Sequence, residues 1–296
     1  MNGAARGDVL QRLGRLDRRW LYLALFACLA ATLWRQPLFR DGLSTFSRPV
    51  FERIEALPPG APVLVSLDYS PASAPEVEPM ALALTRHLLL RGARPVFVTL
   101  YPEGNNMLQR LRDQAIDADF PESREGRDWV ALGYKAGRQM VINALRQDLA
   151  TMYSADLRGA PIDSLPALAG VRRLDDFAII LALSSGTPGL KEWILYGGDP
   201  TGTPVAGGCT GIGAPEFLAY FPGQLVGLLG GLKGASEYEA ALADRYPERA
   251  FPRRAQLAMG PQTVAHALIL LFLVLGNLSY LRPRRRSPGR REGRTA

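Results

Sequence analysis

The stretch of sequence that decides the fold is FAIILALS, at residues 177–184. It is a short and almost entirely apolar run, and the segment SGTPG follows it at residues 185–189. Since polar and apolar residues do not alternate in it, the run is typical of a strand buried on both faces. Strands of that kind occur in parallel sheets that are covered by helices on both sides. The stretch therefore predicts a parallel sheet at the centre of the fold.

Further runs of this kind lie on either side of it. Strands are predicted at residues 62–69, 95–101, 129–132 and 204–208. Helices are predicted, from apolar residues at helical spacing, at residues 76–91, 104–118, 138–153 and 190–196, and residues 216–245 are predicted to be largely helical. Strands that alternate with helices build βαβ units. We therefore predict an α/β fold, a Rossmann-like domain with a mostly parallel sheet.

Two uncharged apolar segments frame this domain. Residues 20–34 read WLYLALFACLAATLW, and residues 263–281 read TVAHALILLFLVLGNLSYL. A membrane span needs about 20 apolar residues; the second segment has them, and the first has Arg and Trp at both ends to reach the interfaces. We expect transmembrane helices at 20–35 and 261–281. The alternatives are a cleaved signal peptide for the first segment and a buried core helix for either.

The net charge of +7 is concentrated at the two ends of the chain. Residues 1–19 carry +3 and residues 282–296 carry +6, whereas the residues between them carry −2. By the positive-inside rule both basic tails are cytoplasmic, and residues 36–260 form an extracytoplasmic domain with stalks at 36–60 and 246–260. The expected partners are the lipid bilayer and either other membrane proteins or further copies of the chain. Nucleic acid is not expected, because the domain has no excess of positive charge.

The composition is that of an ordinary folded protein. Of the 296 residues, 47% are hydrophobic and 21% are charged, which excludes wholesale disorder, collagen and a coiled coil. The two Cys and two His are too few for a disulfide scaffold or a four-Cys zinc site, and we predict no metal site.

The loops that follow the strands are where a ligand would bind. In an open parallel sheet, ligands lie beyond the carboxyl ends of the strands, and Gly, Ser and Thr in such loops allow close approach and hydrogen bonding. Ordinary turn chemistry explains each loop taken alone, whereas all of them together favour a pocket. The predicted ligand-binding residues are Asp68, Tyr69, Ser70, Glu103, Asn105, Lys135, Ser184, Ser185, Thr187, Cys209 and Thr210.

Three of these residues are also candidates for catalysis: Asp68, Ser185 and Cys209. Cys209 lies in a Gly-rich loop where a thiol can become a nucleophile, but the pattern aims neither His87 nor His266 at it as a base. Asp68 at a strand end could be a nucleophile or a Mg²⁺ ligand, and capping a turn is its simpler role. No loop carries a strong nucleotide-binding fingerprint, so the cofactor is left undetermined.

Three stretches carry a resemblance to known sequences. They are GRDWVALGYKAG at 126–137, LSSGTPGLKEWILY at 183–196 and PVAGGCTGIGAPEFLAYFPGQL at 204–225. These stretches resemble segments of uncharacterised, membrane-anchored bacterial proteins, and the resemblance covers most of residues 62–240. It implies the same fold and the same layout with two anchors. Together with the positive-inside orientation, it leads us to expect the cytoplasmic (inner) membrane of a bacterium, with the domain in the periplasm. It implies no activity.

These observations lead to one main hypothesis about function. We expect a two-pass membrane-anchored protein whose extracytoplasmic domain binds a small ligand or a partner protein in a membrane complex. One alternative is a membrane-anchored hydrolase or transferase that uses the same loops. The other is a structural subunit that assembles through its anchors. Whether the protein is an enzyme is left open.

Overall fold

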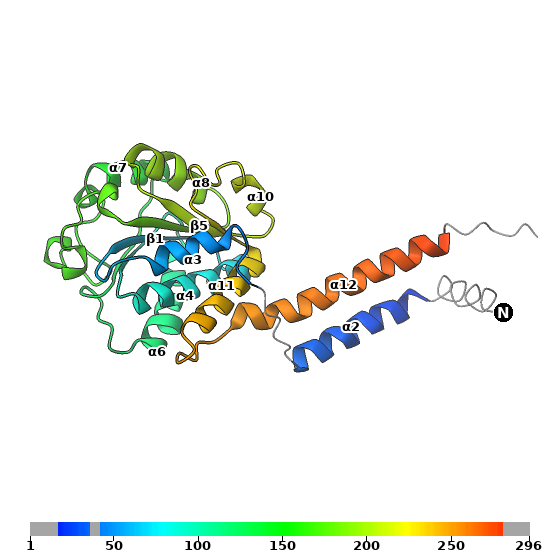
Figure 1. Cartoon of the computed structure of the whole chain (residues 1–296). Coiled ribbons are helices and arrows are strands. Elements are labelled where there is room, and N and C mark those ends of the chain that lie inside the picture. Colours follow the sequence, from blue (N-terminus) through cyan, green and yellow to red (C-terminus); the bar gives the residue numbers. More distant parts are fainter. Residues whose placement is uncertain (1–16, 36–41, 281–296) are drawn as a thin grey trace, which may run out of the picture. The chain divides into compact units, whose positions relative to one another are not determined.

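The computed structural model of the chain describes residues 17–35 and 42–280. The chain divides into two compact units, which are Leu38–Met259 and the pair of segments Met1–Pro37 with Gly260–Ala296. The first of these units contains the sheet and the helices that cover it (Figure 1).

The sheet has six parallel strands in the order β3-β2-β1-β4-β5-β6. The strands are β1 (Pro62–Asp68), β2 (Arg94–Thr99), β3 (Val130–Tyr134), β4 (Ile179–Ser184), β5 (Val205–Cys209) and β6 (Leu228–Gly230). The chain builds one half of the sheet outward from β1 and the other half outward from β4, so the switch point of the strand order lies between these two strands. This is the Rossmann-like α/β architecture that the sequence predicted, and the strand order is the Rossmann order.

The central strands are mostly apolar because both of their faces are covered. All six residues of β4 are buried. Ile179, Leu181 and Leu183 belong to one hydrophobic core, whereas Ile180 and Ala182 belong to the other. Successive side chains of a strand point to opposite faces, so a strand between two cores has apolar residues at successive positions rather than at alternate ones.

Helices form the two layers that cover the sheet. They are α3 (Ser47–Glu55), α4 (Ala74–Leu90), α5 (Gly104–Leu111), α6 (Asp117–Asp119), α7 (Gln139–Gln147), α8 (Leu190–Glu192), α9 (Asp199–Thr201), α10 (Ala214–Phe217) and α11 (Gly231–Arg245). Helices α3, α4, α5 and α11 contribute to one core, and α7 and α8 to the other. Figure 1 shows α3, α4 and α11 on the opposite side of the sheet from α7 and α8.

Two predicted helices differ from the structure in their extent. The helix predicted at 104–118 is present, with a π-helical turn at Arg112–Ile116 between α5 and α6. The helix predicted at 138–153 ends at Gln147, because Asp148 is extended and its carboxylate accepts a hydrogen bond from the Ala150 N–H at 2.9 Å. A side chain that bonds its own backbone in this way competes with helix continuation. The connection to β4 then contains only short 3₁₀ turns.

The region predicted as largely helical, 216–245, contains the strand β6 before α11 begins. Beside β6, the N–H of Leu228 donates to the Phe46 carbonyl at 2.9 Å, and a Cβ on Gly227 would lie 2.7 Å from that same oxygen. The strand is only three residues long. Such a short strand has no detectable period, and its pairing with β5 is set by distant residues.

The described residues of the two predicted stalks, 42–60 and 246–259, belong to the compact unit that contains the sheet. Helix α3 lies within 36–60, and its Val50, Phe51 and Ile54 side chains are buried in the core. At the other end, within 246–260, Ala255 and Gln256 are buried. The prediction gave weight to Pro and Arg in these segments, whereas the apolar stripe of α3 decides where it packs.

Two helices lie at the ends of the chain, α2 (Arg18–Arg35) and α12 (Arg254–Tyr280). Among the described residues, one helical stretch is long and apolar enough to cross a membrane, Arg254–Asn277. Helix α2 has only 18 residues, and Arg18, Arg19 and Arg35 are among them. Among the described residues, the structure therefore supports one candidate membrane helix where the sequence predicted two, because the arginines leave α2 too short an apolar run.

Candidate functional site

The carboxyl ends of three neighbouring strands bring predicted site residues into one row. Asp68 at the end of β1 pairs with Ser184 at the end of β4, and Ser184 pairs with Cys209 at the end of β5. The first of these pairs lies at the switch point between β1 and β4. Ligands of open parallel sheets bind at this position, because the loops of the two halves diverge there and leave a crevice.

A cavity of about 130 Å³ lies at this edge, between the loops that follow β4 and β5. We call it the β4/β5 pocket. It is lined by Ser184, Ser185, Gly186, Thr187, Lys191, Cys209, Thr210, Gly213, Glu216 and Phe217. The lining includes five predicted residues: Ser184, Ser185, Thr187, Cys209 and Thr210.

Some polar groups of the pocket already have hydrogen-bond partners within the chain, and others do not. Lys191 Nζ donates to Glu216 Oε1 at 3.1 Å, which joins the first turn of α8 to α10. The Ser185 hydroxyl is hydrogen-bonded to Tyr101. In the part of the chain that the structure describes, the hydroxyls of Thr187 and Thr210 have no hydrogen-bond partner and are free to bind a ligand.

The first N–H groups of α8 are not available to an anion. The Leu190 N–H donates to Ser184 Oγ at 3.1 Å, and the Gly189 N–H donates to Glu192 Oε2 at 2.7 Å. Free N–H groups at a helix start are what bind phosphate in many nucleotide-binding proteins. Since side chains of the chain itself occupy these donors, the polar groups left in the lining of the pocket are the hydroxyls and the Lys191–Glu216 pair.

Asp68 is buried below the strand ends and does not line the β4/β5 pocket. Its carboxylate accepts hydrogen bonds from Ser66 Oγ at 2.7 Å, Leu100 N at 2.7 Å and Trp193 Nε1 at 2.9 Å. Burial raises the pKa of Asp68 to about 6, and the three hydrogen bonds act in the opposite direction. The carboxylate thus ties β1 to the end of β2 and to the π-helical turn Trp193–Gly198.

Cys209 lines the pocket but lacks the surroundings of a nucleophile. Burial, together with the nearby carboxylates of Glu76 and Glu216, raises the pKa of its thiol to about 12. A reactive Cys needs the opposite environment, with a positive charge or a general base beside it. The imidazole of His87 is instead bonded to Glu55 at 2.8 Å and to Tyr238 at 2.7 Å.

The remaining predicted residues lie outside the pocket. Tyr69 is fully buried, and the Ser70 carbonyl accepts from the N–H groups at the start of α4. Glu103 is exposed. Asn105 Oδ1 accepts from the Tyr134 N–H at 2.9 Å, and Lys135 Nζ lies 5.2 Å from the centre of the Tyr153 ring. All five residues lie at the ends of β1, β2 and β3, which form the other half of the sheet, and the contacts of Asn105 and Lys135 hold the loops after β2 and β3 in place.

Three lining residues were not among the predicted site residues: Lys191, Glu216 and Phe217. Each lies in the first helical turn after a Gly-containing loop, where a helix still faces the carboxyl edge of the sheet. Extending each predicted loop by one helical turn would have found them. Among the described residues, no group of three or more His, Cys, Asp or Glu side chains is arranged to hold a metal ion.

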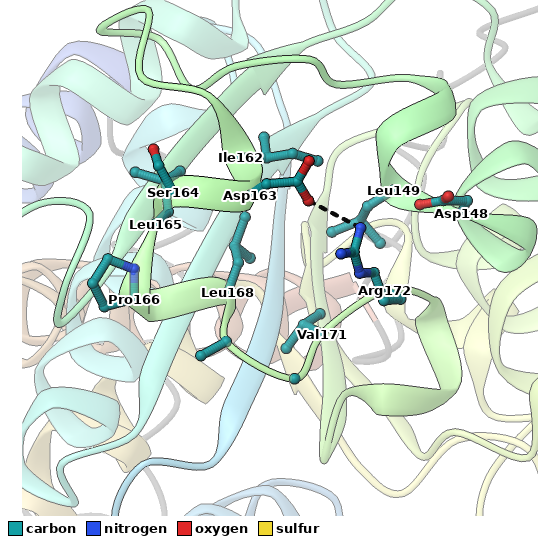
Figure 2. Close-up of a pocket in the computed structure, with 12 residues that line it drawn as sticks. Asp148, Leu149, Ile162, Asp163, Ser164, Leu165, Pro166, Leu168, Val171 and Arg172 are labelled. Carbon is teal, nitrogen blue, oxygen red and sulfur yellow. Dashed lines mark ion pairs between the residues drawn. The ribbon is translucent and has the colours of Figure 1, made fainter.

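A second cavity, of about 270 Å³, lies in the long connection between α7 and β4 (Figure 2). Its walls include the aliphatic side chains of Leu149, Ile162, Leu165, Leu168 and Val171. Figure 2 shows the ion pair between Arg172 and Asp163, whose atoms are 2.9 Å apart. Arg94, at the first residue of β2, bonds the carbonyls of Pro166 and Ala169 beside this cavity. The cavity therefore lies near the amino end of β2, away from the strand ends where the predicted residues gather.

Comparison with known proteins found no protein similar to this chain. The chain matches no protein-family model, no curated protein and no solved structure.

Proposed function

We propose that this chain is a membrane-anchored binding protein whose α/β domain holds a small polar ligand in the β4/β5 pocket. The observation that carries the proposal is the place of the pocket beside the switch point, together with the unbonded hydroxyls of Thr187 and Thr210. At about 130 Å³ the pocket is smaller than the roughly 300–1,000 Å³ typical of drug-sized ligands. A small anion, an amino acid or a similar compact polar molecule fits this size and chemistry.

Binding is better supported than catalysis by the state of the candidate catalytic groups. Asp68 has its carboxylate occupied by three donors, and the Cys209 thiol is kept protonated by burial. The Ser185 hydroxyl bonds a tyrosine, whereas a nucleophilic serine needs a base. The hydrolase or transferase alternative would need a catalytic group other than these three.

The membrane anchor in this proposal is α12, with α2 as a second and shorter membrane helix. The side chains of Trp20, Phe26 and Trp34 on α2 are exposed, as are Leu270 and Leu273 on α12. The basic residues at both chain ends support a cytoplasmic location for the tails, and so an extracytoplasmic location for the domain. The resemblance to bacterial membrane-anchored proteins supports the cytoplasmic membrane of a bacterium.

The first experiment is thermal unfolding of the full chain in lipid nanodiscs with inorganic phosphate, serine and glucose as separate probes. A probe present at about 100 times its dissociation constant should stabilise the domain by about 2.7 kcal/mol. We expect at least one probe to raise the Tm of the wild type, and Thr210→Val to abolish that rise.

The matched control is Thr151→Val, because Thr151 is an exposed Thr in a 3₁₀ turn outside the pocket. This variant should keep the full shift. The proposal is wrong if no probe raises the Tm, or if both variants respond like the wild type.

A further inference from the structure

Between residues 263 and 277, the polar residues of α12 lie along one line of the helix. Thr263, His266 and Asn277 share this line with Leu270 and Leu273, at alternating spacings of three and four residues. We call these five residues the α12 seam. Every other position from 264 to 276 is Ala, Val, Leu, Ile, Phe or Gly. A repeat of about 3.5 residues is the spacing with which two helices pack along a left-handed seam.

The seam is exposed in the described chain. Leu270 is 63% exposed and Leu273 is 58% exposed, and the other three seam residues are also exposed. The described residues offer the His266 ring no hydrogen-bond partner. Asn277 Nδ2 donates to the carbonyl of Leu273 at 3.0 Å within the same helix, and the described chain supplies no donor to its Oδ1.

The depth of these residues in a membrane makes the missing partners costly. From Gly260 to Tyr280 the helix is about 30 Å long at 1.5 Å per residue, which matches the hydrocarbon core of a bilayer. His266 would then lie about 9 Å inside the boundary on the side of the domain. A polar group in hydrocarbon must be hydrogen-bonded, so such a residue in a membrane helix indicates a contact with another helix.

We propose that two copies of this chain pair in parallel along the α12 seam. The inference rests on the membrane insertion of α12 in the proposed function. Two copies inserted in the same orientation bring each residue opposite its own counterpart. A neutral imidazole and a carboxamide each carry both a donor and an acceptor, so His266 can bond His266 of a second copy, and Asn277 can do the same.

Helix α2 of the same chain is a poorer partner for the seam. Between residues 23 and 33 its only hydroxyl is that of Thr32, which donates to the carbonyls of Cys28 at 3.1 Å and Leu29 at 2.8 Å of its own helix. The self-complementary pattern therefore favours a second copy of α12.

Disulfide cross-linking of the full chain in membranes tests the pairing. On a Cys28→Ser background, Leu270→Cys and Leu273→Cys should form a disulfide-linked species of twice the chain mass. The controls Leu268→Cys and Leu275→Cys place the thiol on the opposite side of the helix and should not. Equal cross-linking on both sides, or a linked species of another mass, would overturn the pairing of two copies.

Carbonate extraction of the same membranes separates the two possible failures. If the chain is extracted, membrane insertion itself fails, and the proposed anchor fails with it. If the chain stays in the membrane and no seam variant forms a dimer, only the pairing is wrong.

Energy transfer between labelled copies in lipid vesicles measures the contribution of the polar residues. His266→Leu and Asn277→Leu should each weaken dimerisation about 3- to 30-fold, the usual range for one such contact. Both variants make the helix more apolar, so a loss of dimer cannot come from poorer insertion. Leu275→Ala should leave dimerisation unchanged, and an equal loss in this control would contradict the proposal.

Discussion

Asp68 shows how a single residue at the carboxyl edge can serve the fold. Its side chain is fully buried and accepts from a hydroxyl, a backbone N–H and an indole N–H that belong to β1, the residue after β2 and the turn after α8. These partners are spread over more than a hundred residues of sequence. The carboxylate positions the strand ends on which the loops of the β4/β5 pocket are built.

Removing this carboxylate should therefore reduce stability. Asp68→Ala leaves three donors without an acceptor, and each unsatisfied buried group costs about 1–3 kcal/mol. We expect the free energy of unfolding to fall by about 3 kcal/mol or more, measured by denaturant unfolding of the full chain. Asp113→Ala, at an exposed position of the π-helical turn after α5, should change it by less than about 0.5 kcal/mol.

A different outcome would change the role assigned to Asp68. If Asp68→Ala were as stable as the wild type and only ligand-induced stabilisation were lost, the residue would belong to the binding site.

At the scale of elements, the start of α12 is tied to α11 by Glu239. Its buried carboxylate accepts a hydrogen bond from the Gln256 N–H at 3.0 Å and also bonds the N–H groups of Ala255 and Arg254. A carboxylate at this position satisfies the unpaired N–H groups of the first helical turn and is favoured by the helix dipole. The bond therefore fixes the first turn of the proposed membrane helix to the last helix of the domain.

Glu239 should make stability depend on pH. Burial raises its pKa from 4.5 to about 7 in the folded chain, while the N–H groups and Arg86 act in the opposite direction. The folded state holds this proton more tightly than the unfolded state does, so protonation of Glu239 stabilises the fold. This contribution to the free energy of unfolding is fully present below pH 4.5 and is lost as the pH rises through 7. Glu239→Gln removes this titration and keeps an acceptor for the N–H groups.

The measurement is denaturant unfolding of the wild type and of Glu239→Gln over a pH series. Between about pH 5 and pH 8, the wild type should lose up to about 3 kcal/mol relative to the variant. Other titrating groups contribute equally to both proteins and cancel in the difference. Parallel pH profiles would show that Glu239 does not titrate in this range.

At the scale of the whole molecule, the chain combines a compact domain with apolar helices at both ends. The domain, Leu38–Met259, has both faces of its sheet covered and two hydrophobic cores. The end segments instead expose large apolar side chains, among them Trp34 at 89% and Leu270 at 63%. A surface of this kind is costly in water and favourable in lipid.

Reporter fusions test the orientation proposed for the molecule. Alkaline phosphatase, which is active only after export, should be active when inserted after Glu248, in an exposed part of the domain. It should be inactive when fused after Ala296. The reverse pattern would contradict the positive-inside assignment.

A fusion before Met1 tests whether α2 crosses the membrane. With two crossing helices the reporter there should be inactive, like the one after Ala296. An active reporter at the N-terminus would show that α2 does not cross the membrane, so that of α2 and α12 only α12 would cross it.

The sequence predicts the central strands well and the outer parts of the fold poorly. The strand predicted at residues 177–184 corresponds to β4, because a strand between two cores is a nearly continuous apolar run that can be recognised in the sequence. β6 was missed, since three residues show no period. The end of α7 was misplaced, because Leu149 donates its N–H to the carbonyl of Arg172, a bond that local sequence does not reveal.

The candidate site, too, was predicted only in part from the sequence. Thr210 was predicted from the rule that loops at the carboxyl edge bind ligands, and in the structure it lines the β4/β5 pocket. The same rule selected Asp68, but it does not show that three donors turn the carboxylate inward. It also does not show that Lys191 and Glu216, which are 25 residues apart, meet across the pocket.

The sequence by itself therefore determined the α/β class, the central strands and the apolar C-terminal helix. Each of these depends on residues close together in the chain, whose spacing is readable as a period or a run. Only the tertiary structure decided the strand order, the inward bonding of Asp68 and the closure of the β4/β5 pocket. These features depend on which distant residues come into contact, and that is set by the packing of the whole domain around its two cores.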